Sequence, residues 1–315
     1  MRDLRILFMG TPDFAVETLK AIIENDYTVV GVITAPDKPA GRGRKLKASA
    51  VKEYALSKNL RVLQPTNLKD EHFIEELKSL RANLNIVVAF RMLPKVVWDM
   101  PEYGTFNLHA SLLPAYRGAA PINWAVINGE QKTGITTFFI DEKIDTGHII
   151  LQKEVPINDD DTAGILHDTL MTEGAELVVQ TIKAIENDTV EVQPQPKDTS
   201  FKTAYKLNRE NTKINWEKDI RTINNLIRGL SPYPAAWCEL YNKGNSEHIK
   251  IYSAKLVEEP HNFDIGKVII EDSTIKVAVK NGYMIIEKLQ LPGKKAMDSK
   301  ALLNGYVFYR DAKMS

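Results

Sequence analysis

The stretch that decides the fold class spans residues 4–33 and reads LRILFMGTPDFAVETLKAIIENDYTVVGVI. Its opening apolar run ends at Gly10, as is typical of a buried strand. Thr11 can cap a helix that begins at Pro12, and a second strand-like run follows at 27–33. Strand, helix and strand within about 30 residues predict a βαβ unit, and therefore a parallel sheet with a right-handed crossover.

The same alternation continues along the chain to about residue 130. Helices are predicted over 50–57 and 70–80, and strands over 60–63 and 84–90. This pattern indicates the α/β class, with a doubly wound, mostly parallel sheet of Rossmann-like form.

The pattern then changes, first within the same sheet and then in the tail. Strand-like runs at 133–140 and 148–157 predict an antiparallel pair added to the sheet, and one long amphipathic helix follows over 162–185. After a helix predicted over 217–229, short strand-like runs occur at 235–241, 248–255, 267–271, 274–279 and 284–290. Short strands at this density predict a second, smaller domain, an OB-like β-barrel.

Two prolines, Pro194 and Pro196, lie in a mostly polar stretch that is typical of a linker. We therefore expect an N-terminal α/β domain over 1–189, a linker over 190–206 and a C-terminal β-barrel domain over 207–315.

The charge of the chain is balanced only on average. The 315 residues carry 41 Lys and Arg against 41 Asp and Glu. Residues 1–205 hold 23 basic and 28 acidic residues, whereas residues 206–315 hold 18 and 13. A positive second half indicates a polyanionic partner, although such an imbalance is more often only a solvated face.

Several classes of protein are disfavoured by missing motifs. The sequence has no GxGxxG after its first strand, no GxxxxGK[ST], no HExxH and no CxxC. Its single cysteine, Cys238, excludes a disulfide scaffold, and the scattering of its six histidines disfavours a zinc site. No apolar run approaches the roughly 20 residues of a membrane helix, and the first residues do not resemble a signal peptide. We expect a cytoplasmic protein that needs no metal.

One stretch, 104–122, carries an unusual set of polar residues: GTFNLHASLLPAYRGAAPI. On a strand, Asn107 and His109 would project from one face, at the carboxyl end where open α/β sheets bind ligands. The alternative is that both side chains satisfy loop backbone groups, and for an isolated pair the two interpretations have equal weight.

A carboxylate could complete this pair. Asp145 lies in the turn DEKIDTG at 141–147, from which it could reach His109, fix its tautomer and stabilise its charged form. An aspartate that bonds its own turn is the common alternative, and spacing alone favours it.

Taken together, these motifs resemble those of the folate-dependent formyltransferases. The resemblance rests on Asn-Leu-His at 107–109, Ser-Leu-Leu-Pro at 111–114 and Asp-Thr-Gly at 145–147. It extends to GTPDFA at 10–15, PDKPAGRGRKL at 36–46, YRGAAP at 116–121 and GLSPYPAAW at 229–237. It therefore covers nearly the whole chain. It favours the functional interpretation of Asn107, His109 and Asp145 over the structural alternatives.

The resemblance implies an enzyme that transfers a formyl group from 10-formyltetrahydrofolate to the α-amine of initiator methionyl-tRNA, a step of translation initiation. It implies that Asn107, His109 and Asp145 form the catalytic set. Asn107 and His109 would donate to the oxyanion, and Asp145 would orient His109 and help to relay the proton, which leaves the identity of the general base open. It implies no metal and no stable protein partner, so we expect a monomer.

The resemblance also implies a folate site beside the strand ends. An apolar wall is expected from Val88, Phe90, Met92 and Leu93, contacts from Ser111, Leu112, Leu113 and Pro114, and backbone contacts from Ile140 and Asp141. Most of these apolar side chains could equally belong to the core. Arg91 stands where the family often has a small residue, and it could touch the folate or point to solvent.

A basic loop is the expected tRNA contact in the first domain. Its cations are Lys38, Arg42, Arg44, Lys45 and Lys47, with Gly41 and Gly43 between them. Five cations favour phosphates, and the resemblance implies a loop that enters the acceptor stem. The positive second domain would add phosphate contacts.

Two alternative functions remain open at this point. A formyltransferase that acts on a small amine, such as glycinamide ribonucleotide or an amino sugar, would use the same three residues without needing the basic loop. A folate- or RNA-binding module without catalysis would not need the three residues at all.

Overall fold

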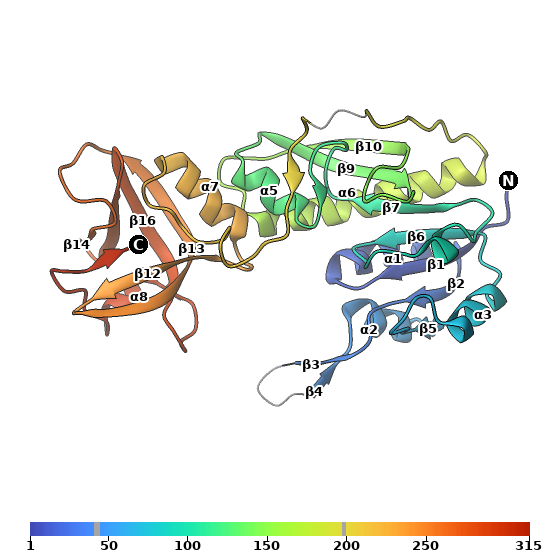
Figure 1. Cartoon of the computed structure of the whole chain (residues 1–315), viewed down its shortest axis with the longest axis horizontal. Helices are drawn as coiled ribbons and strands as arrows, with labels where there is room; N and C mark the ends of the chain where they lie inside the picture. Colours follow the sequence, from blue (N-terminus) through green and yellow to red (C-terminus); the bar gives the residue numbers. More distant parts are fainter. Residues whose placement is uncertain (41–44, 197–199) are drawn as a thin grey trace. The chain divides into compact units, whose positions relative to one another are not determined.

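The computed structural model describes residues 1–40, 45–196 and 200–315 (Figure 1). By contacts between residues, the chain divides into two compact units. The first comprises 1–118, 133–155 and 167–203, and the second comprises 119–132, 156–166 and 204–315. The segments 119–132 and 156–166 thus belong to the second unit, although they precede the predicted linker.

The first unit is built on a seven-stranded sheet in the order β10-β9-β7-β6-β1-β2-β5. These strands are β1 (Arg5–Gly10), β2 (Thr28–Ile33), β5 (Val62–Leu63), β6 (Leu84–Val88), β7 (Thr105–His109), β9 (Lys132–Phe139) and β10 (Ile149–Pro156). From β5 to β7 neighbouring strands run parallel, and β9 pairs antiparallel with β7. The predicted doubly wound α/β class, including the added antiparallel pair, is confirmed.

The helices that cover this sheet are α1 (Asp13–Glu24), α2 (Ala50–Ser57), α3 (Glu71–Ser79), α4 (Lys95–Trp98) and α6 (Ala163–Glu186). Four of them lie where the sequence predicts them, and α4 was not predicted. The first helix begins at Asp13 and not at Pro12, and it has no side-chain cap, so the predicted capping by Thr11 is wrong. Ser49 and Asp70 cap α2 and α3, because each side chain accepts a backbone N–H of the first turn. Two short strands, β3 (Lys38–Ala40) and β4 (Lys45–Lys47), form a hairpin.

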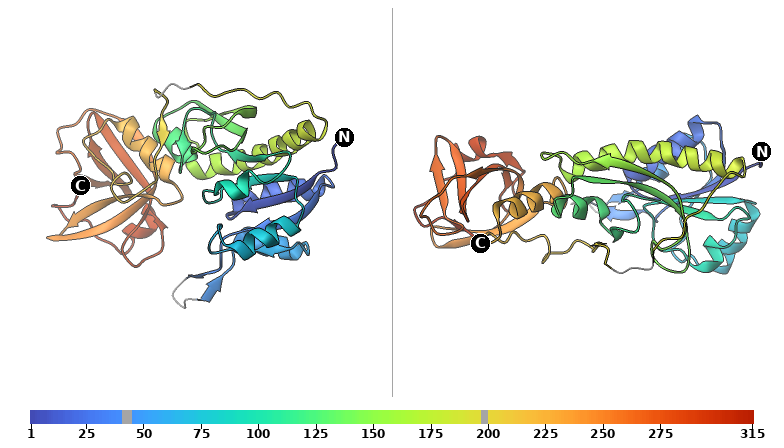
Figure 2. Two further views of the ribbon diagram at one scale, coloured as in Figure 1. Left: turned by 45° about the vertical axis from the view of Figure 1, so that its right-hand side comes forward. Right: turned by 90° about the horizontal axis from the view of Figure 1, so that it is seen from above.

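The long helix α6 lies along the β7–β9 part of the sheet (Figure 2). A Cβ on Gly174 would lie only 2.8 Å from the side chain of Leu108, so glycine lets the helix approach the strand. The hydroxyls of Thr137 and Thr181 hydrogen-bond across the same contact at 2.8 Å. Because Leu108 faces α6, its neighbours Asn107 and His109 face the opposite side of the sheet.

The chain leaves the central strand β1 toward β2 and β5, and then returns to place β6 and β7 on the other side. Such a reversal opens a crevice at the carboxyl ends of the strands, where open α/β sheets bind their ligands. One sequence expectation is wrong here, because the strand predicted over 84–90 ends at Val88. Ala89 takes a left-handed φ of 47°, which turns the chain out of the sheet.

The second unit packs α7 (Ile220–Leu230) against an antiparallel sheet of OB-like, half-barrel form. Its strands are β12 (Ala236–Asn242), β13 (Asn245–Glu258), β14 (Val268–Glu271), β15 (Thr274–Val279), β16 (Gly282–Gln290), β17 (Met297–Asp298) and β18 (Lys313–Met314). The remaining elements of the chain are β8 (Arg117–Gly118), α5 (Pro121–Ile127), β11 (Thr203–Ala204) and α8 (Ser299–Leu303). The predicted second, β-rich domain is confirmed.

The start of α7 shows how a cap overrides apolar spacing. The helix predicted from residue 217 begins at Ile220, because the Asp219 carboxylate accepts the Thr222 backbone N–H at 2.9 Å. The Thr222 hydroxyl and this N–H both donate to Asp219 and lower the pKa of its carboxyl group. At the other end, Gly229 lies against Ile127 of α5, and the Asn123 amide donates to the Gly229 carbonyl at 2.8 Å.

Candidate active site

The polar residues predicted from the sequence meet at the end of β7. His109 is the last residue of the strand and is only 6% exposed, whereas Asn107 is half-buried. Among the residues that the structure describes, none forms a hydrogen bond with the Asn107 side-chain amide. A buried imidazole therefore lies next to an amide whose donors are unused, at the carboxyl edge of the sheet.

The His109 ring has a defined tautomer. Its Nε2 lies 2.9 Å from the Tyr116 carbonyl oxygen, and because a carbonyl only accepts, Nε2 carries the hydrogen. In the neutral ring Nδ1 therefore has the free lone pair. Nδ1 lies 3.8 Å from Oδ2 of Asp145, which is too long for a hydrogen bond but suits an ion pair once the ring is charged.

Asp145 is brought to His109 by tertiary structure. Its carboxylate accepts the Gly118 backbone N–H at 2.9 Å, which holds Oδ2 back from the ring. The tautomer of His109 is thus set by the Tyr116 carbonyl, and not by Asp145 as the sequence suggested. Asp145 instead faces the nitrogen that would gain a proton, and its side chain is only 15% exposed.

Three non-glycine residues around this site have left-handed backbone angles. They are Ala89 after β6, Tyr116 beside His109, and Asp145, with φ values of 47°, 59° and 55°. Such angles are uncommon outside glycine and cost free energy, so they persist where the surrounding structure holds them. Nine other non-glycine residues of the described chain have such angles, so these three shape the turns around His109 without indicating a function by themselves.

Sequence reasoning missed two residues that position the Asp145 turn. The Gln195 amide donates to the carbonyl oxygens of Asp145 and Gly147 at 3.0 and 2.8 Å. Arg117 in turn donates to Oε1 of Gln195 from Nε and Nη2, at 3.1 and 2.6 Å. The only signal in the sequence was the pair of prolines on either side of Gln195, which restrict the backbone there.

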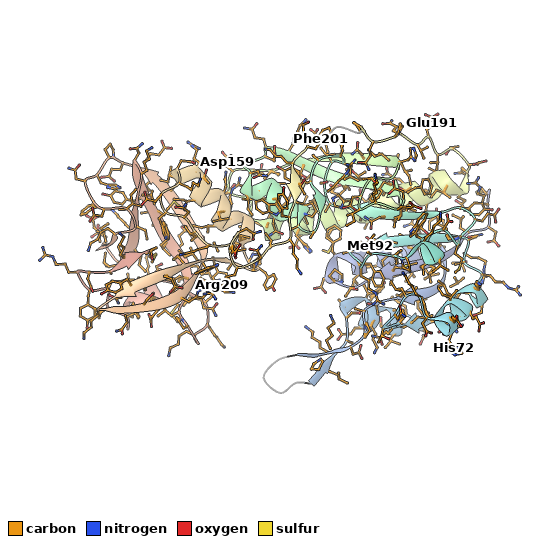
Figure 3. The ribbon with its side chains drawn as sticks, viewed as in Figure 1. His72, Met92, Asp159, Glu191, Phe201 and Arg209 are labelled. Atoms are coloured by element: carbon orange, nitrogen blue, oxygen red, sulfur yellow. The ribbon has the colours of Figure 1, made fainter. Side chains whose placement is uncertain are left out.

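The residues expected to form a folate wall differ in exposure. Val88 and Leu93 are buried in the core, and Phe90 is half-buried against it. Met92, labelled in Figure 3, is 69% exposed. Arg91 does not point freely into solvent: it donates to the carbonyl oxygens of Pro65 and Thr66, and so ties the loop after β6 to the segment after β5.

The segment 111–114, from which folate contacts were predicted, is buried or half-buried along its whole length. The Ser111 hydroxyl is fully buried and donates to the Ala115 carbonyl at 2.6 Å. Leu113 packs against Phe138 and Ile149, whereas Leu112 and Pro114 are half-buried. Contacts from Ser111 and Leu113 to a ligand would therefore come from their backbone.

The two predicted backbone contacts lie at the start of the Asp145 turn. Ile140 is half-buried and its N–H donates to the Thr105 carbonyl at 2.8 Å. The exposed Asp141 carboxylate accepts the Lys143 backbone N–H and the Thr146 hydroxyl, which shapes the turn.

The predicted basic loop forms the β3–β4 hairpin. Lys38 and Lys47 lie directly opposite each other across it, and both are exposed. Lys45 belongs to β4, whereas Arg42 and Arg44 lie outside the described residues. Like charges placed opposite each other destabilise a strand pair, so this hairpin favours a negatively charged partner.

The base of the hairpin is held by Asp37. Lys52 Nζ and Gln64 Nε2 lie 2.6 and 2.8 Å from its carboxylate oxygens. The hydrogen bond from Lys52, followed by that from Gln64, lowers the pKa of the Asp37 carboxyl group below its ordinary 3.8. The charged carboxylate therefore stabilises the folded state.

This network predicts a pH-dependent stability. A lowered folded-state pKa stabilises the fold above 3.8, and the contribution is lost as the pH falls through the folded-state value. Asp37→Asn is expected to lower the melting temperature at about pH 7 but hardly at about pH 2. Asp26→Asn, at an exposed position outside the network, is the control, and equal effects of Asp37→Asn at both pH values would contradict the prediction.

Neither a metal-binding cluster nor a membrane-spanning helix occurs in the described part of the chain. There, no group of three or more His, Cys, Asp or Glu side chains is placed to hold a metal ion. In the same residues, no helix has both the length and the apolar composition to cross a membrane.

Comparison with known proteins defines the class. The formyl transferase family profile matches residues 4–182, and the profile of the formyl transferase C-terminal domain matches residues 206–307. The chain belongs to the formyl transferase family, as the motifs predicted.

Relatives within the family extend over the whole chain. It is 63% identical to a methionyl-tRNA formyltransferase of Flavobacterium johnsoniae, over 100% of both chains. It is 52% identical to the methionyl-tRNA formyltransferase of Bacteroides thetaiotaomicron, over 99% of both.

Solved structures share the fold at lower identity. An N-formyltransferase from Helicobacter canadensis, in complex with folinic acid and dTDP-3-aminofucose, superposes with a TM-score of 0.63 at 25% identity, over 90% of this chain and 98% of that one. A sugar 3N-formyl transferase gives a TM-score of 0.65 at 23% identity, over 94% of this chain and 100% of that one.

Proposed function

We propose that the protein transfers the formyl group of 10-formyltetrahydrofolate to the α-amine of initiator methionyl-tRNA. The observation that carries the proposal is the grouping of Asn107, His109 and Asp145 at the carboxyl edge of the sheet. The full-length similarity to methionyl-tRNA formyltransferases supports this acceptor over a small amine.

We assign His109 the role of general base and not the role of oxyanion donor that the resemblance implied, because its one N–H is already bonded to the Tyr116 carbonyl. The neutral ring can accept the proton of the attacking amine at Nδ1, because Nε2 is already bonded to the Tyr116 carbonyl. The resulting imidazolium would face the Asp145 carboxylate 3.8 Å away, which stabilises its charge. The same proton can then pass to the folate nitrogen as its bond to the formyl carbon breaks, so that protons balance over the cycle.

Asn107 is suited to a different part of the reaction. The formyl oxygen gains negative charge when the amine adds, and a preorganised N–H donor at that oxygen lowers the barrier by roughly 3–4 kcal/mol. The unused amide of Asn107 can supply this donor without breaking an existing hydrogen bond among the described residues.

The folate donor would lie across the ends of β6 and β7. The large apolar side chain of Met92 is exposed there, and so is Ile144 in the Asp145 turn at 62%. With the half-buried Phe90, these side chains suit the flat rings of a folate. We propose contacts from Phe90, Met92, the 111–114 segment and the backbone of Ile140 and Asp141.

Gln195 has a testable role in positioning the Asp145 turn. Gln195→Ala is expected to lower kcat about tenfold with little change in KM, because two carbonyls lose their donor and the turn shifts. Both constants are measured well below the melting temperature. Gln193→Ala, at an exposed position of the same segment, is the control. A lower melting temperature with an unchanged kcat would assign Gln195 a structural role only.

For the tRNA, we propose contacts from the β3–β4 hairpin and from the C-terminal domain over 207–315, with catalysis in the domain over 1–189. Lys38, Arg42, Arg44, Lys45 and Lys47 would meet phosphates of the acceptor stem. Since the three catalytic residues come from one chain, we also propose a monomer, working in the cytoplasm where its tRNA substrate is found.

The hairpin lysines can be tested as a pair. Lys38→Ala combined with Lys47→Ala is expected to lower kcat/KM for methionyl-tRNA roughly tenfold and to flatten its dependence on salt, because about two phosphate contacts are lost. Lys69→Ala with Lys78→Ala, also exposed, is the charge-matched control. An unchanged salt dependence would exclude these two lysines as phosphate contacts.

The function itself is tested with a labelled formyl donor. Initiator methionyl-tRNA, elongator methionyl-tRNA, glycinamide ribonucleotide and an amino sugar nucleotide are each offered as the acceptor. We expect label only on methionyl-tRNA, with a preference for the initiator. Label on a small amine instead would support the alternative formyltransferase, and binding of folate or RNA without transfer would support a module without catalysis.

A further inference from the structure

The second unit contains a cavity that catalysis does not use. Its volume is about 450 Å³, within the roughly 300–1,000 Å³ of small-ligand sites. It lies between the segment that precedes α7 and the paired strands β12 and β13. Its lining residues are Leu207, Asn208, Arg209, Thr212, Pro234, Ala235, Trp237, His248 and Lys250.

One wall of the cavity is an aromatic stack. On the β12–β13 pair, Trp237 lies opposite Lys250 and His248 lies opposite Glu239, so Trp237 and His248 are diagonal neighbours. Their ring centroids are 4.4 Å apart with an angle of 35° between the planes. Trp237 is 9% exposed, whereas the His248 side chain is 41% exposed. The His248 ring therefore packs on Trp237 and is still partly exposed to a ligand.

Cations surround this stack. The Arg209 guanidinium lies 5.0 Å from the centroid of Trp237, and Lys213 Nζ lies 5.4 Å from it. The indole N–H donates to the Arg209 carbonyl at 2.8 Å, which fixes the segment that carries both cations. Lys250 Nζ lies at the cavity wall, 3.0 Å from the Pro234 carbonyl.

The charged residues that line the cavity are basic. None of the described residues that line the cavity is acidic, while Arg209 and Lys250 are cations. Glu239 is the carboxylate next to the cavity, and it lies 3.6 Å from His248 Nδ1. A ring face with cations beside it and no lining carboxylate suits a ligand that is both aromatic and anionic.

We propose that this cavity binds one unpaired nucleotide of the tRNA, with its base against the His248 ring and its phosphate between Arg209 and Lys250. The inference rests on the proposed function, since that function supplies the RNA. An unpaired base can leave its strand and stack on a protein ring, whereas a duplex would offer the cavity only its phosphates.

The test compares a short single-stranded RNA with a duplex of the same length, by fluorescence anisotropy on the full chain. His248→Ala is expected to weaken binding of the single strand roughly tenfold and binding of the duplex less than about twofold. Arg209→Ala is expected to weaken binding of the single strand and to reduce its salt slope by about 0.7.

Matched controls come from residues away from the cavity. His72→Ala, on α3 of the first unit and labelled in Figure 3, controls for loss of an exposed histidine. Lys300→Ala, exposed on α8, controls for loss of a cation from the second unit. Both are expected to bind the two RNAs like the wild type.

The outcomes separate this inference from the proposed function. If His248→Ala leaves both affinities unchanged, or weakens them equally, the cavity does not bind a base and the inference is wrong. Formylation of methionyl-tRNA by the same wild-type preparation is measured in parallel. A wild type that fails to formylate would overturn the proposed function, even where the effect on single-stranded RNA is found.

Discussion

His109→Ala is expected to lower the single-turnover rate of formyl transfer to methionyl-tRNA roughly 100-fold. The variant removes the Nδ1 that can accept the amine proton and leaves the Asp145 carboxylate without its partner at 3.8 Å. Because the ring is only 6% exposed and lies at the sheet edge, tRNA affinity is expected to remain close to that of the wild type. Rapid-quench measurement with saturating donor and tRNA isolates the chemical step.

The other two residues of the catalytic set are tested by the same measurement. Asn107→Ala and Asp145→Ala are each expected to cost roughly 100-fold as well. Asp145→Asn keeps an acceptor for the Gly118 N–H but loses the charge that would stabilise the imidazolium, so its rate should fall with the turn intact.

The exposed His72 on α3 supplies the control, since His72→Ala removes an imidazole far from the chemistry in sequence and in contacts. A near-normal single-turnover rate for His109→Ala would exclude it as the base.

Gly147→Ala is the second change with a large expected effect. A Cβ at this position would lie 1.7 Å from the Phe139 carbonyl oxygen and 2.9 Å from its carbon, which is backbone at the end of β9 and cannot move aside cheaply. The 141–147 turn must therefore shift and carry Asp145 away from His109. A displacement of about 1 Å in a catalytic group can cost roughly 100-fold in rate, so kcat is expected to fall by about that factor.

The matched control is Gly305→Ala, because a Cβ at Gly305 meets no heavy atom within 4 Å. Circular dichroism and tRNA affinity show whether the Gly147→Ala protein is folded. A folded Gly147→Ala protein with a normal kcat would show that the turn tolerates the displacement, and would remove the argument that Asp145 must be held where it is.

The sequence was sufficient for most of the fold. The apolar runs that begin at Leu4 and Leu84 form buried strands, and α2 and α3 have both an apolar face and a side-chain cap. The errors are local ones. The strand after Leu84 stops short because Ala89 is left-handed, and α7 starts late because Asp219 caps it. Neither backbone angles nor capping geometry can be read from apolar spacing.

The assignment of segments to the two units also depended on long-range contacts. The stretch 119–132 ends 58 residues before the predicted linker begins at 190, yet α5 packs on α7 through Ile127 and Gly229. A contact between helices so far apart leaves no trace in the periodicity of either one.

By itself, the sequence determined the α/β class, the β-rich second domain, the pairing of Asn107 with His109 on one strand face, and the membership of the formyl transferase family. These follow from local periodicity and from motifs that are contiguous in the chain. Only the tertiary structure decided that Tyr116 sets the His109 tautomer, that Gln195 and Arg117 hold the Asp145 turn, and that Trp237 and His248 line a cavity with Arg209. Each of these depends on where a loop or a strand register places atoms from distant residues, and hydrogen bonds and ring contacts act only over a few ångströms.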